Sequence, residues 1–174
     1  MEFQLDQALA ILRRTPIVVN ELLRDLPDDW VRPNEGPDTW SPYDIVGHLI
    51  QGEENDWIPR AKIILEHGVT RAFDPFDRFA QFKLSEGKTL SILLDRFALL
   101  RQQNLEELTN LRITTEQLAK RGQHPDLGEV TLAQLLATWT VHDLSHISQI
   151  TRVMCKQYGS AVGAWKEYLP ILTR

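Results

Sequence analysis

The chain has 174 residues, of which 43% are hydrophobic and 25% charged, and its formal net charge is −5. This length and composition indicate one soluble globular domain, residues 1–174, with enough apolar residues to bury a sizeable core. The acidic balance argues against nucleic acid as the main partner, because neutralising phosphates requires a basic surface.

The sequence also lacks the features of a secreted or membrane-spanning chain. No apolar run approaches the roughly 20 residues needed to span a bilayer, and the N-terminal "MEFQLDQALA" lacks the basic start and apolar core of a secretory signal. We therefore expect a cytoplasmic protein with no membrane contact. Cys155 is the only cysteine, which excludes an intramolecular disulfide. We interpret it as a small buried or half-buried residue and not as a nucleophile.

The first half of the chain predicts two helices. Residues 3–25 place apolar side chains at three- and four-residue steps, and Pro16 should kink or split this helix. Residues 27–39, with three prolines and a glycine, are typical of a loop. A second helix is expected over residues 42–67, where Ser41 caps, Pro42 takes the first position and Asp44 completes a capping box. Pro59 should bend this helix, and Gly68 should end it.

The second half predicts two further long helices and no strand. Residues 69–88 form a long connection, a third helix spans residues 89–111, and "TTEQLAKRG" indicates a short helical piece. The segment "QHPDLGEV" is expected to be a loop, and Thr131 caps a fourth helix that reaches residue 158. In the tail after it, we expect Trp165, Tyr168 and Leu169 to close one end of the core.

Four long helices with one connection of about 20 residues predict an all-α fold. The long connection separates the second helix from the third, and a parallel pair of helices requires such a crossover. We therefore predict a four-helix bundle with a long crossover between helices 2 and 3.

Three histidines form the candidate chemical site. His142 and His146 lie one turn apart on the apolar face of the fourth helix, and His48 borders the apolar side of the second. Three neutral imidazoles could bind one divalent ion and leave a coordination position open. Imidazole suits zinc, nickel, iron and copper better than magnesium or calcium. A metal bound in this way activates water or polarises a carbonyl or a sulfur nucleophile.

Several acidic residues lie close to these histidines along the two helices. Asp143, Asp56 and Asp44 are candidates to accept the second N–H of a ligating imidazole. Asp143 lies on the apolar face, where a carboxylate needs a partner, so pairing with an arginine such as Arg96 or Arg101 is an equal alternative. Glu53 and Asp56 are candidates for a general base.

Gly52, His67 and His124 could each have a functional role, but each also has a structural explanation. Gly52 leaves space one turn after His48, which suits either a substrate or a closely packed neighbour. We interpret His67 as a residue at a helix C-terminus, where its charge is favourable, and His124 as a loop residue.

Two segments resemble a known family. "WSPYDIVGHL", followed about 90 residues later by "TVHDLSHISQITRVM", closely resembles the DinB-like superfamily, and "VGAWKEYLPIL" is also similar to its members. The resemblance implies an up-down-down-up bundle with a metal held by His48, His142 and His146. Zinc or nickel is the metal it implies, with iron as a further candidate, and homodimers are frequent among its members. Some relatives are S-transferases that use a low-molecular-weight thiol.

The sequence therefore predicts a divalent-metal-dependent enzyme of DinB type that activates water or a thiolate, either a hydrolase or a thiol-dependent S-transferase. The alternative is a non-catalytic bundle that binds a small molecule or a partner, with a structural or vestigial metal site. Exposed aromatic residues such as Trp30 or Phe76 would then line an interface.

Overall fold

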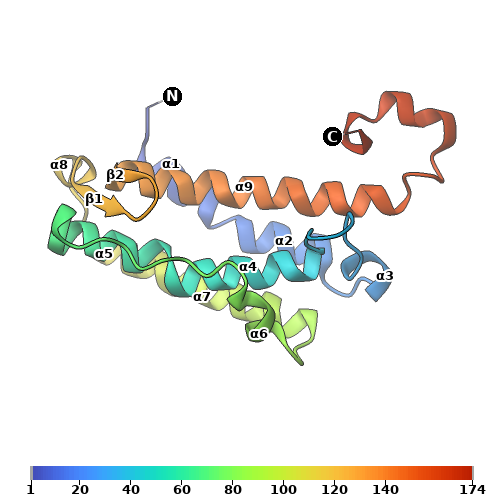
Figure 1. Cartoon of the computed structure of the whole chain (residues 1–174), viewed down its shortest axis with the longest axis horizontal. Helices are drawn as coiled ribbons and strands as arrows, with labels where there is room; N and C mark the ends of the chain where they lie inside the picture. The colour runs from blue at the N-terminus through green and yellow to red at the C-terminus, as the bar shows by residue number, and fades with distance from the viewer. Residues whose placement is uncertain (1, 174) are drawn as a thin grey trace.

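The computed structural model describes residues 2–173, whose long helices form four rods packed side by side (Figure 1). Each rod is one helix or two helices in line: α1 (Leu5–Leu12) with α2 (Thr15–Leu23), α4 (Pro42–Asn55) with α5 (Trp57–His67), α7 (Leu90–Asn110), and α9 (Leu132–Gln157). The prediction of an all-α four-helix bundle is confirmed. No helix within residues 2–173 has the length and hydropathy that crossing a membrane requires.

Two prolines explain why the first two rods are divided. A proline has no backbone N–H, so the carbonyl four residues before it loses its helical partner. Pro16 thereby frees the carbonyl of Leu12, where α1 ends, and Pro59 frees that of Asn55, where α4 ends. The second break lies at Asp56, three residues before the proline itself.

Contacts between the rods show whether neighbouring rods run parallel or antiparallel. Tyr43, Glu53 and Lys62 of the second rod meet Lys88, Arg101 and Glu107 in the same order, so α4–α5 and α7 run parallel. Trp57 stacks on Trp139 while His48 meets His146, so α9 runs antiparallel to the second rod. The first rod is antiparallel to α7, because Leu12 contacts Arg101 and Arg24 pairs with Asp95. In chain order the rods therefore run up, down, down and up.

A crossover of 22 residues returns the chain from the end of α5 to the start of α7. It contains η1 (Gly68–Thr70) and α6 (Ala80–Ser85), and α6 packs on α4. The Tyr43 hydroxyl lies 2.6 Å from the carbonyl oxygen of Ser85 and 2.8 Å from that of Lys88. Any side chain at Gly47 would collide with Ser85 Oγ. These contacts hold the crossover against α4.

The prediction of no strands is wrong for one segment. The expected loop "QHPDLGEV" belongs to an antiparallel hairpin of β1 (Arg121–His124) and β2 (Gly128–Thr131), placed between α8 (Thr115–Leu118) and α9. Strands of four residues are too short to show a clear alternation of apolar and polar residues. Tertiary contacts hold the hairpin: a Cβ at Gly122 would lie 2.6 Å from Ile64 Cγ1, and the Phe73 N–H donates to the Gln123 carbonyl.

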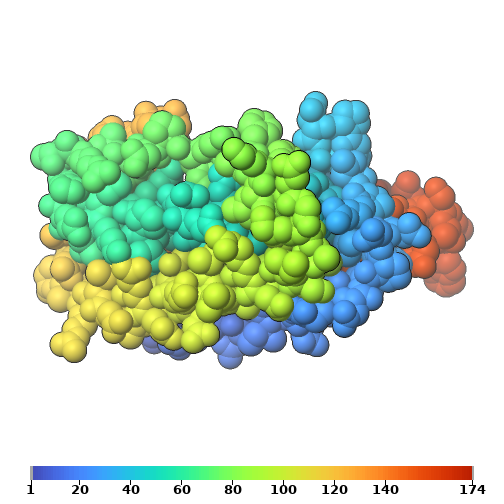
Figure 2. Space-filling view, turned by 90° about the horizontal axis from the view of Figure 1, so that it is seen from below, coloured from blue at the N-terminus to red at the C-terminus, as the bar shows by residue number. Residues whose placement is uncertain are grey.

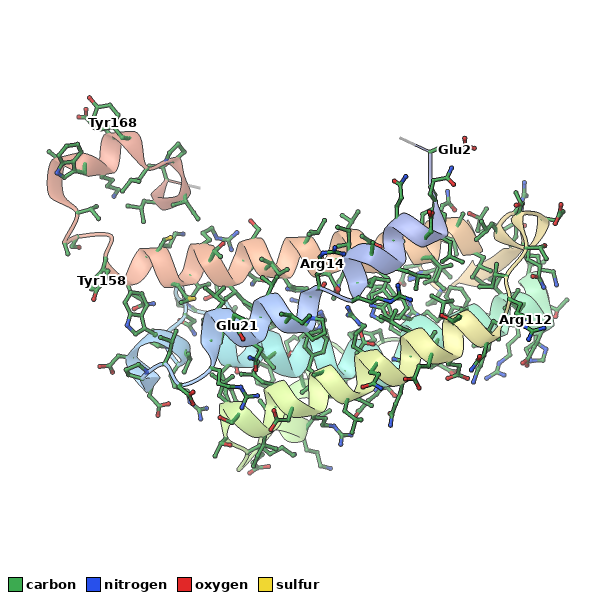
Figure 3. All side chains as sticks on the ribbon, turned by 180° about the vertical axis from the view of Figure 1, so that it is seen from behind. Glu2, Arg14, Glu21, Arg112, Tyr158 and Tyr168 are labelled. Carbon is green, nitrogen blue, oxygen red and sulfur yellow. The ribbon has the colours of Figure 1, made fainter. Side chains whose placement is uncertain are left out.

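The prediction for the tail is also wrong. After α9 the chain forms η2 (Gly163–Tyr168) and η3 (Pro170–Leu172), with Trp165 71% and Tyr168 76% exposed. Figure 3 shows this segment standing away from the rods, and Figure 2 shows it at one end of the molecule beyond α3 (Asp28–Val31). Gly163, with a positive φ, turns the chain after α9. Trp165 and Tyr168 therefore stay outside the apolar cleft beside Trp30, which is lined from the tail by Val162, Leu169, Ile171 and Leu172.

The apolar core is divided into two clusters with a polar layer between them. One cluster surrounds Trp57 and Trp139, and the other surrounds Ile50, Phe97 and Ile150. Buried polar residues from three rods lie between the two clusters, namely His48, Glu53, Arg101 and Asp143. The candidate site belongs to this layer.

Candidate metal centre

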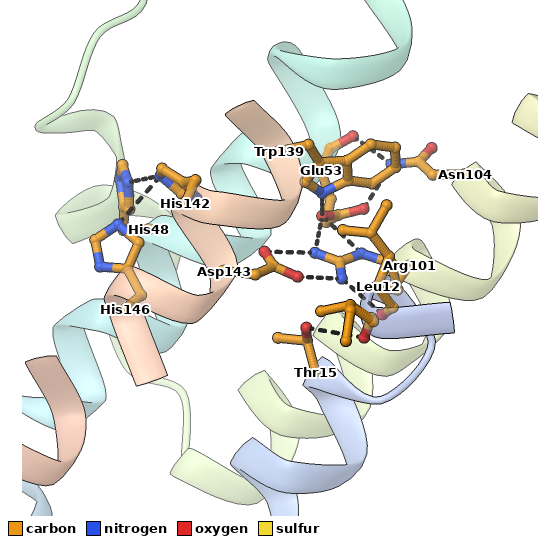
Figure 4. Close-up of polar contacts among 11 residues, drawn as sticks. Leu12, Thr15, His48, Glu53, Arg101, Asn104, Trp139, His142, Asp143 and His146 are labelled. Carbon is orange, nitrogen blue, oxygen red and sulfur yellow. Dashed lines mark hydrogen bonds and ion pairs between the residues drawn. The ribbon is translucent and has the colours of Figure 1, made fainter. Parts of the chain in front are cut away.

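The three predicted histidines meet where α4 packs against α9, and Figure 4 shows their rings together. His142 Nε2 lies 3.0 Å from His48 Nε2 and 3.1 Å from His146 Nε2. One ring nitrogen from each side chain lies within 4.8 Å of the others. The i, i+4 spacing on α9 directs two of the rings to one side, and packing of α4 against α9 adds the third.

Burial keeps these imidazoles uncharged at neutral pH. Burial lowers the pKa of His48 to about 3, with further lowering by His146 and Arg78. Burial also lowers the pKa of His142 to about 2, and the neighbouring His146 and His48 add to the effect. Burial lowers the pKa of His146 as well, against the opposing hydrogen bond with Gln149. Neutral rings present the lone pairs that a metal requires.

The donor set fits a first-row transition metal. It consists of three imidazoles, and within residues 2–173 no carboxylate or thiol belongs to the cluster. Hard cations such as magnesium and calcium prefer oxygen donors, whereas zinc, nickel, iron and copper accept imidazole nitrogen. His146 Nδ1 lies 2.9 Å from Gln149 Oε1, which leaves its Nε2 directed at the other two rings. The cluster therefore has the composition of a three-histidine metal site.

Aromatic side chains surround the cluster. The Trp40 ring lies 4.7 Å from the His48 ring and 6.3 Å from the His146 ring, between centroids. Phe76 of the crossover meets His48 edge-on at 5.8 Å, and Trp57 meets His142 at 5.1 Å. Sequence reasoning missed Trp40, Gln149 and Arg78, and it considered Phe76 only as an interface residue. Trp40 and Arg78 belong to a loop and to the crossover, whose residues carry no periodicity that would place them beside a helix. Gln149 lies three residues after His146 on α9, and this spacing is the signal that could have found it.

The predicted partner role of Asp143 is not what the structure shows. Its carboxylate points away from the histidines (Figure 4) and accepts hydrogen bonds of 2.6 and 3.0 Å from Arg101, which was the alternative expectation. Glu53, a candidate base, accepts from Arg101 Nη2 at 2.7 Å and from Trp139 Nε1 at 3.2 Å. Both carboxylates are therefore engaged in a buried ion network beside the histidines and not within their cluster.

The other two predicted acidic partners also have different roles. Asp44 forms the capping box with Ser41 at the start of α4. Asp56 lies at the break between α4 and α5, where its Oδ1 is 2.7 Å from Arg60 Nε. Within residues 2–173, no protein group bonds the Nδ1 atoms of His48 and His142. In the part of the chain that the structure describes, the three carboxylates instead bind Arg101, Arg60 and the backbone of Ser41.

Gly52 and His67 follow their structural explanations, whereas His124 is the last residue of β1 and not a loop residue. A Cβ at Gly52 would lie 3.2 Å from Trp57 Nε1, so this glycine permits close packing. His67 ends α5 on the surface. His124 Nδ1 accepts the backbone N–H groups of Asp126 and Leu127 and so closes the turn of the hairpin.

Fold and site together define a class of protein, the up-down-down-up helical bundles with a central cluster of three histidines. Comparison with protein families agrees: the model of the DinB superfamily matches residues 11–150, and the chain belongs to this family. Comparison with curated proteins gave no match.

A solved structure supports the fold. YfiT from Bacillus subtilis, described as a probable metal-dependent hydrolase with an unusual four-helix bundle topology, superposes with a TM-score of 0.73. The sequences are 24% identical, and the match covers 90% of this chain and 88% of YfiT.

Proposed function

We propose that His48, His142 and His146 hold one divalent metal ion, and that the protein is a metal-dependent hydrolase. The observation that carries this proposal is the convergence of three uncharged imidazole nitrogens on one point, with no carboxylate among them. Zinc and nickel suit such a donor set, and iron is a further candidate. The description of YfiT as a probable metal-dependent hydrolase supports the same reaction class.

When bound, the metal would supply a Lewis acid that lowers the pKa of water or polarises a substrate carbonyl. The residues of the chain prepare the site for it. Burial keeps the three rings unprotonated, and Gln149 fixes the orientation of His146 through Nδ1. The rings of Trp40, Phe76 and Trp57 exclude bulk water from the sides of the cluster. This low-polarity surrounding strengthens the electrostatic interactions inside the site.

Transfer to or from a low-molecular-weight thiol is the second candidate reaction, supported by the resemblance to a superfamily in which some members are S-transferases. The same metal site would activate a thiolate in place of water. A screen of ester and amide hydrolysis beside thiol transfer, on one metal-loaded preparation, separates the two reactions.

Elemental analysis tests the metal site itself. Untagged protein and its His142→Ala variant should be purified without added metal, with His67→Ala as the control because His67 lies outside the cluster. We expect one equivalent of zinc, nickel or iron in the wild type and in His67→Ala, and none in His142→Ala. Wild type without metal, even after addition of zinc and nickel, would refute the proposal.

Thermal unfolding distinguishes a catalytic metal from a structural one. A His146→Ala variant that loses metal and activity but keeps its melting temperature supports the catalytic role. A loss of several degrees would instead favour the non-catalytic alternative, since metal binding energy then contributes to folding.

We further propose that two copies of the chain associate. The support is an apolar groove between α1 and α9, lined by residues that include Phe3, Ile11, Ala137 and Val141. Val141 is 64% exposed, and Leu144 one turn further along α9 is 48% exposed. The cytoplasmic location and the lack of a nucleic-acid partner stay predictions from the composition.

A further inference from the structure

Arg78 lies beside the three histidines on the crossover. Its guanidinium carbon is 5.3 Å from the centroid of the Trp40 ring and 5.4 Å from that of Phe79. Trp40 in turn packs against both His48 and His146. Arg78 is also near enough to His48 to lower the pKa of that imidazole through its charge. Contacts with the two rings thus hold this arginine at the edge of the cluster.

Arg78 is exposed and, within residues 2–173, forms no ion pair with a carboxylate. Two other arginines near the site differ in this respect: Arg101 of the polar layer binds Glu53 and Asp143, and Arg152 of α9 binds Glu35. A guanidinium offers five N–H donors in a planar fork that suits carboxylate or phosphate oxygens. At Arg78 these donors are available to a ligand.

The charge balance around the histidines favours an anionic ligand. Three neutral imidazoles leave the charge of a divalent metal uncompensated. The buried carboxylates of the polar layer, Asp143 and Glu53, lie in the Arg101 network and are held there by its hydrogen bonds. A metal and Arg78 together would therefore give the site a positive charge that only a ligand can neutralise.

We propose that Arg78 binds an anionic group of the substrate, and that the protein acts on an organic anion whose apolar part lies against Trp40 and Phe76. This inference rests on the metal site of the proposed function and names the substrate class for it. The charged end of the ligand lies between Arg78 and the histidines. The two aromatic rings, one from the loop before α4 and one from the crossover, form the apolar wall. Arg78 is a specificity residue in this proposal and does not hold the metal.

Benzoate and its neutral analogue benzamide test the proposal, because they share shape and differ in charge. Binding to zinc-loaded protein should be measured by titration calorimetry in the wild type, in Arg78→Gln and in Lys83→Gln. Lys83 lies on α6 of the same crossover and is exposed, so its variant removes one positive charge without touching the cluster. Zinc content is measured in every preparation.

We expect the wild type to bind benzoate more tightly than benzamide. Arg78→Gln should weaken benzoate binding about tenfold or more, because a hydrogen bond to a charged group is lost. Zinc content and benzamide binding should not change, and Lys83→Gln should behave as the wild type.

Two results would overturn the proposal: zinc-loaded wild type that does not prefer benzoate, or equal benzoate affinity in wild type and Arg78→Gln. Wild type that binds no zinc would instead refute the metal site. The zinc measurement therefore separates failure of the proposed function from failure of the anion subsite.

Discussion

Arg101 is a buried charged residue whose hydrogen-bonding capacity is fully used. Its five N–H donors match five hydrogen bonds, to Glu53, Asp143 and the carbonyl of Leu12. Burial acts to lower the Arg101 pKa, but the charges of Glu53 and Asp143 outweigh it and raise the pKa above its usual range. The carbonyl of Leu12 is available because Pro16 has no N–H to donate. One arginine thus joins all four rods at the height of the histidines.

Replacing Arg101 with Met should destabilise the protein by about 3–5 kcal/mol, because two buried carboxylates would lose their cationic partner. Urea unfolding at neutral pH measures this loss. Arg96→Met is the matched control: its pair with Glu54 lies at the surface, and its loss should cost under about 1 kcal/mol. Equal effects of the two variants would contradict the assignment of the Arg101 network as a structural centre.

At the scale of elements, the loop before α4 places Trp40 over the histidines. Glu35 of this loop accepts hydrogen bonds from Arg152 at 2.9 and 2.7 Å and pairs with Lys156 at 2.7 Å, both on α9. The loop is therefore attached to the same helix that carries His142 and His146. Its hydrogen bond with Arg152 is the main reason that the pKa of Glu35 is lowered to about 2.

Glu35→Gln should reduce the free energy of unfolding by about 1 kcal/mol at pH 7, since the ion pairs are partly exposed. A carboxyl whose pKa is lowered in the folded state stabilises it above the ordinary value of 4.5, and this stabilisation is lost as pH falls toward about 2. The difference between wild type and Glu35→Gln should therefore shrink between pH 5 and pH 3. Urea unfolding across this range measures it, and a difference independent of pH would show that the ion pairs do not hold the loop.

At the scale of the whole molecule, the outward side of α9 carries apolar residues while its inward side carries the histidines. Light scattering after size exclusion should give a mass near twice the 20.1 kDa of one chain. Val141→Glu should shift the protein toward the monomer, because it places a charge in the apolar groove. Val69→Glu is the control, since Val69 is also exposed but lies in η1. A wild-type monomer, or a dimer unaffected by Val141→Glu, would exclude this surface.

Several parts of the structure arise from local sequence signals. Apolar periodicity, the caps at Ser41 and Thr131, and the prolines at 16 and 59 predicted the four rods and their breaks. These signals act over one or two turns, so they can be read from neighbouring residues. The spacing of His142 and His146, with His48 on another apolar face, likewise indicates a shared metal site from the sequence.

Other features depend on contacts between residues far apart in the chain. The sequence could not choose between an imidazole and Arg101 as the partner of Asp143, because that choice depends on how α7 packs on α9. The hairpin of β1 and β2 exists because Gly122 fits against Ile64 and Phe73. Trp40, Phe76 and Arg78 reach the histidines only because the loop and the crossover fold back over α4. Short-range patterns in the sequence are therefore enough to predict the helices and the three candidate ligands, whereas the surroundings of these ligands depend on tertiary packing.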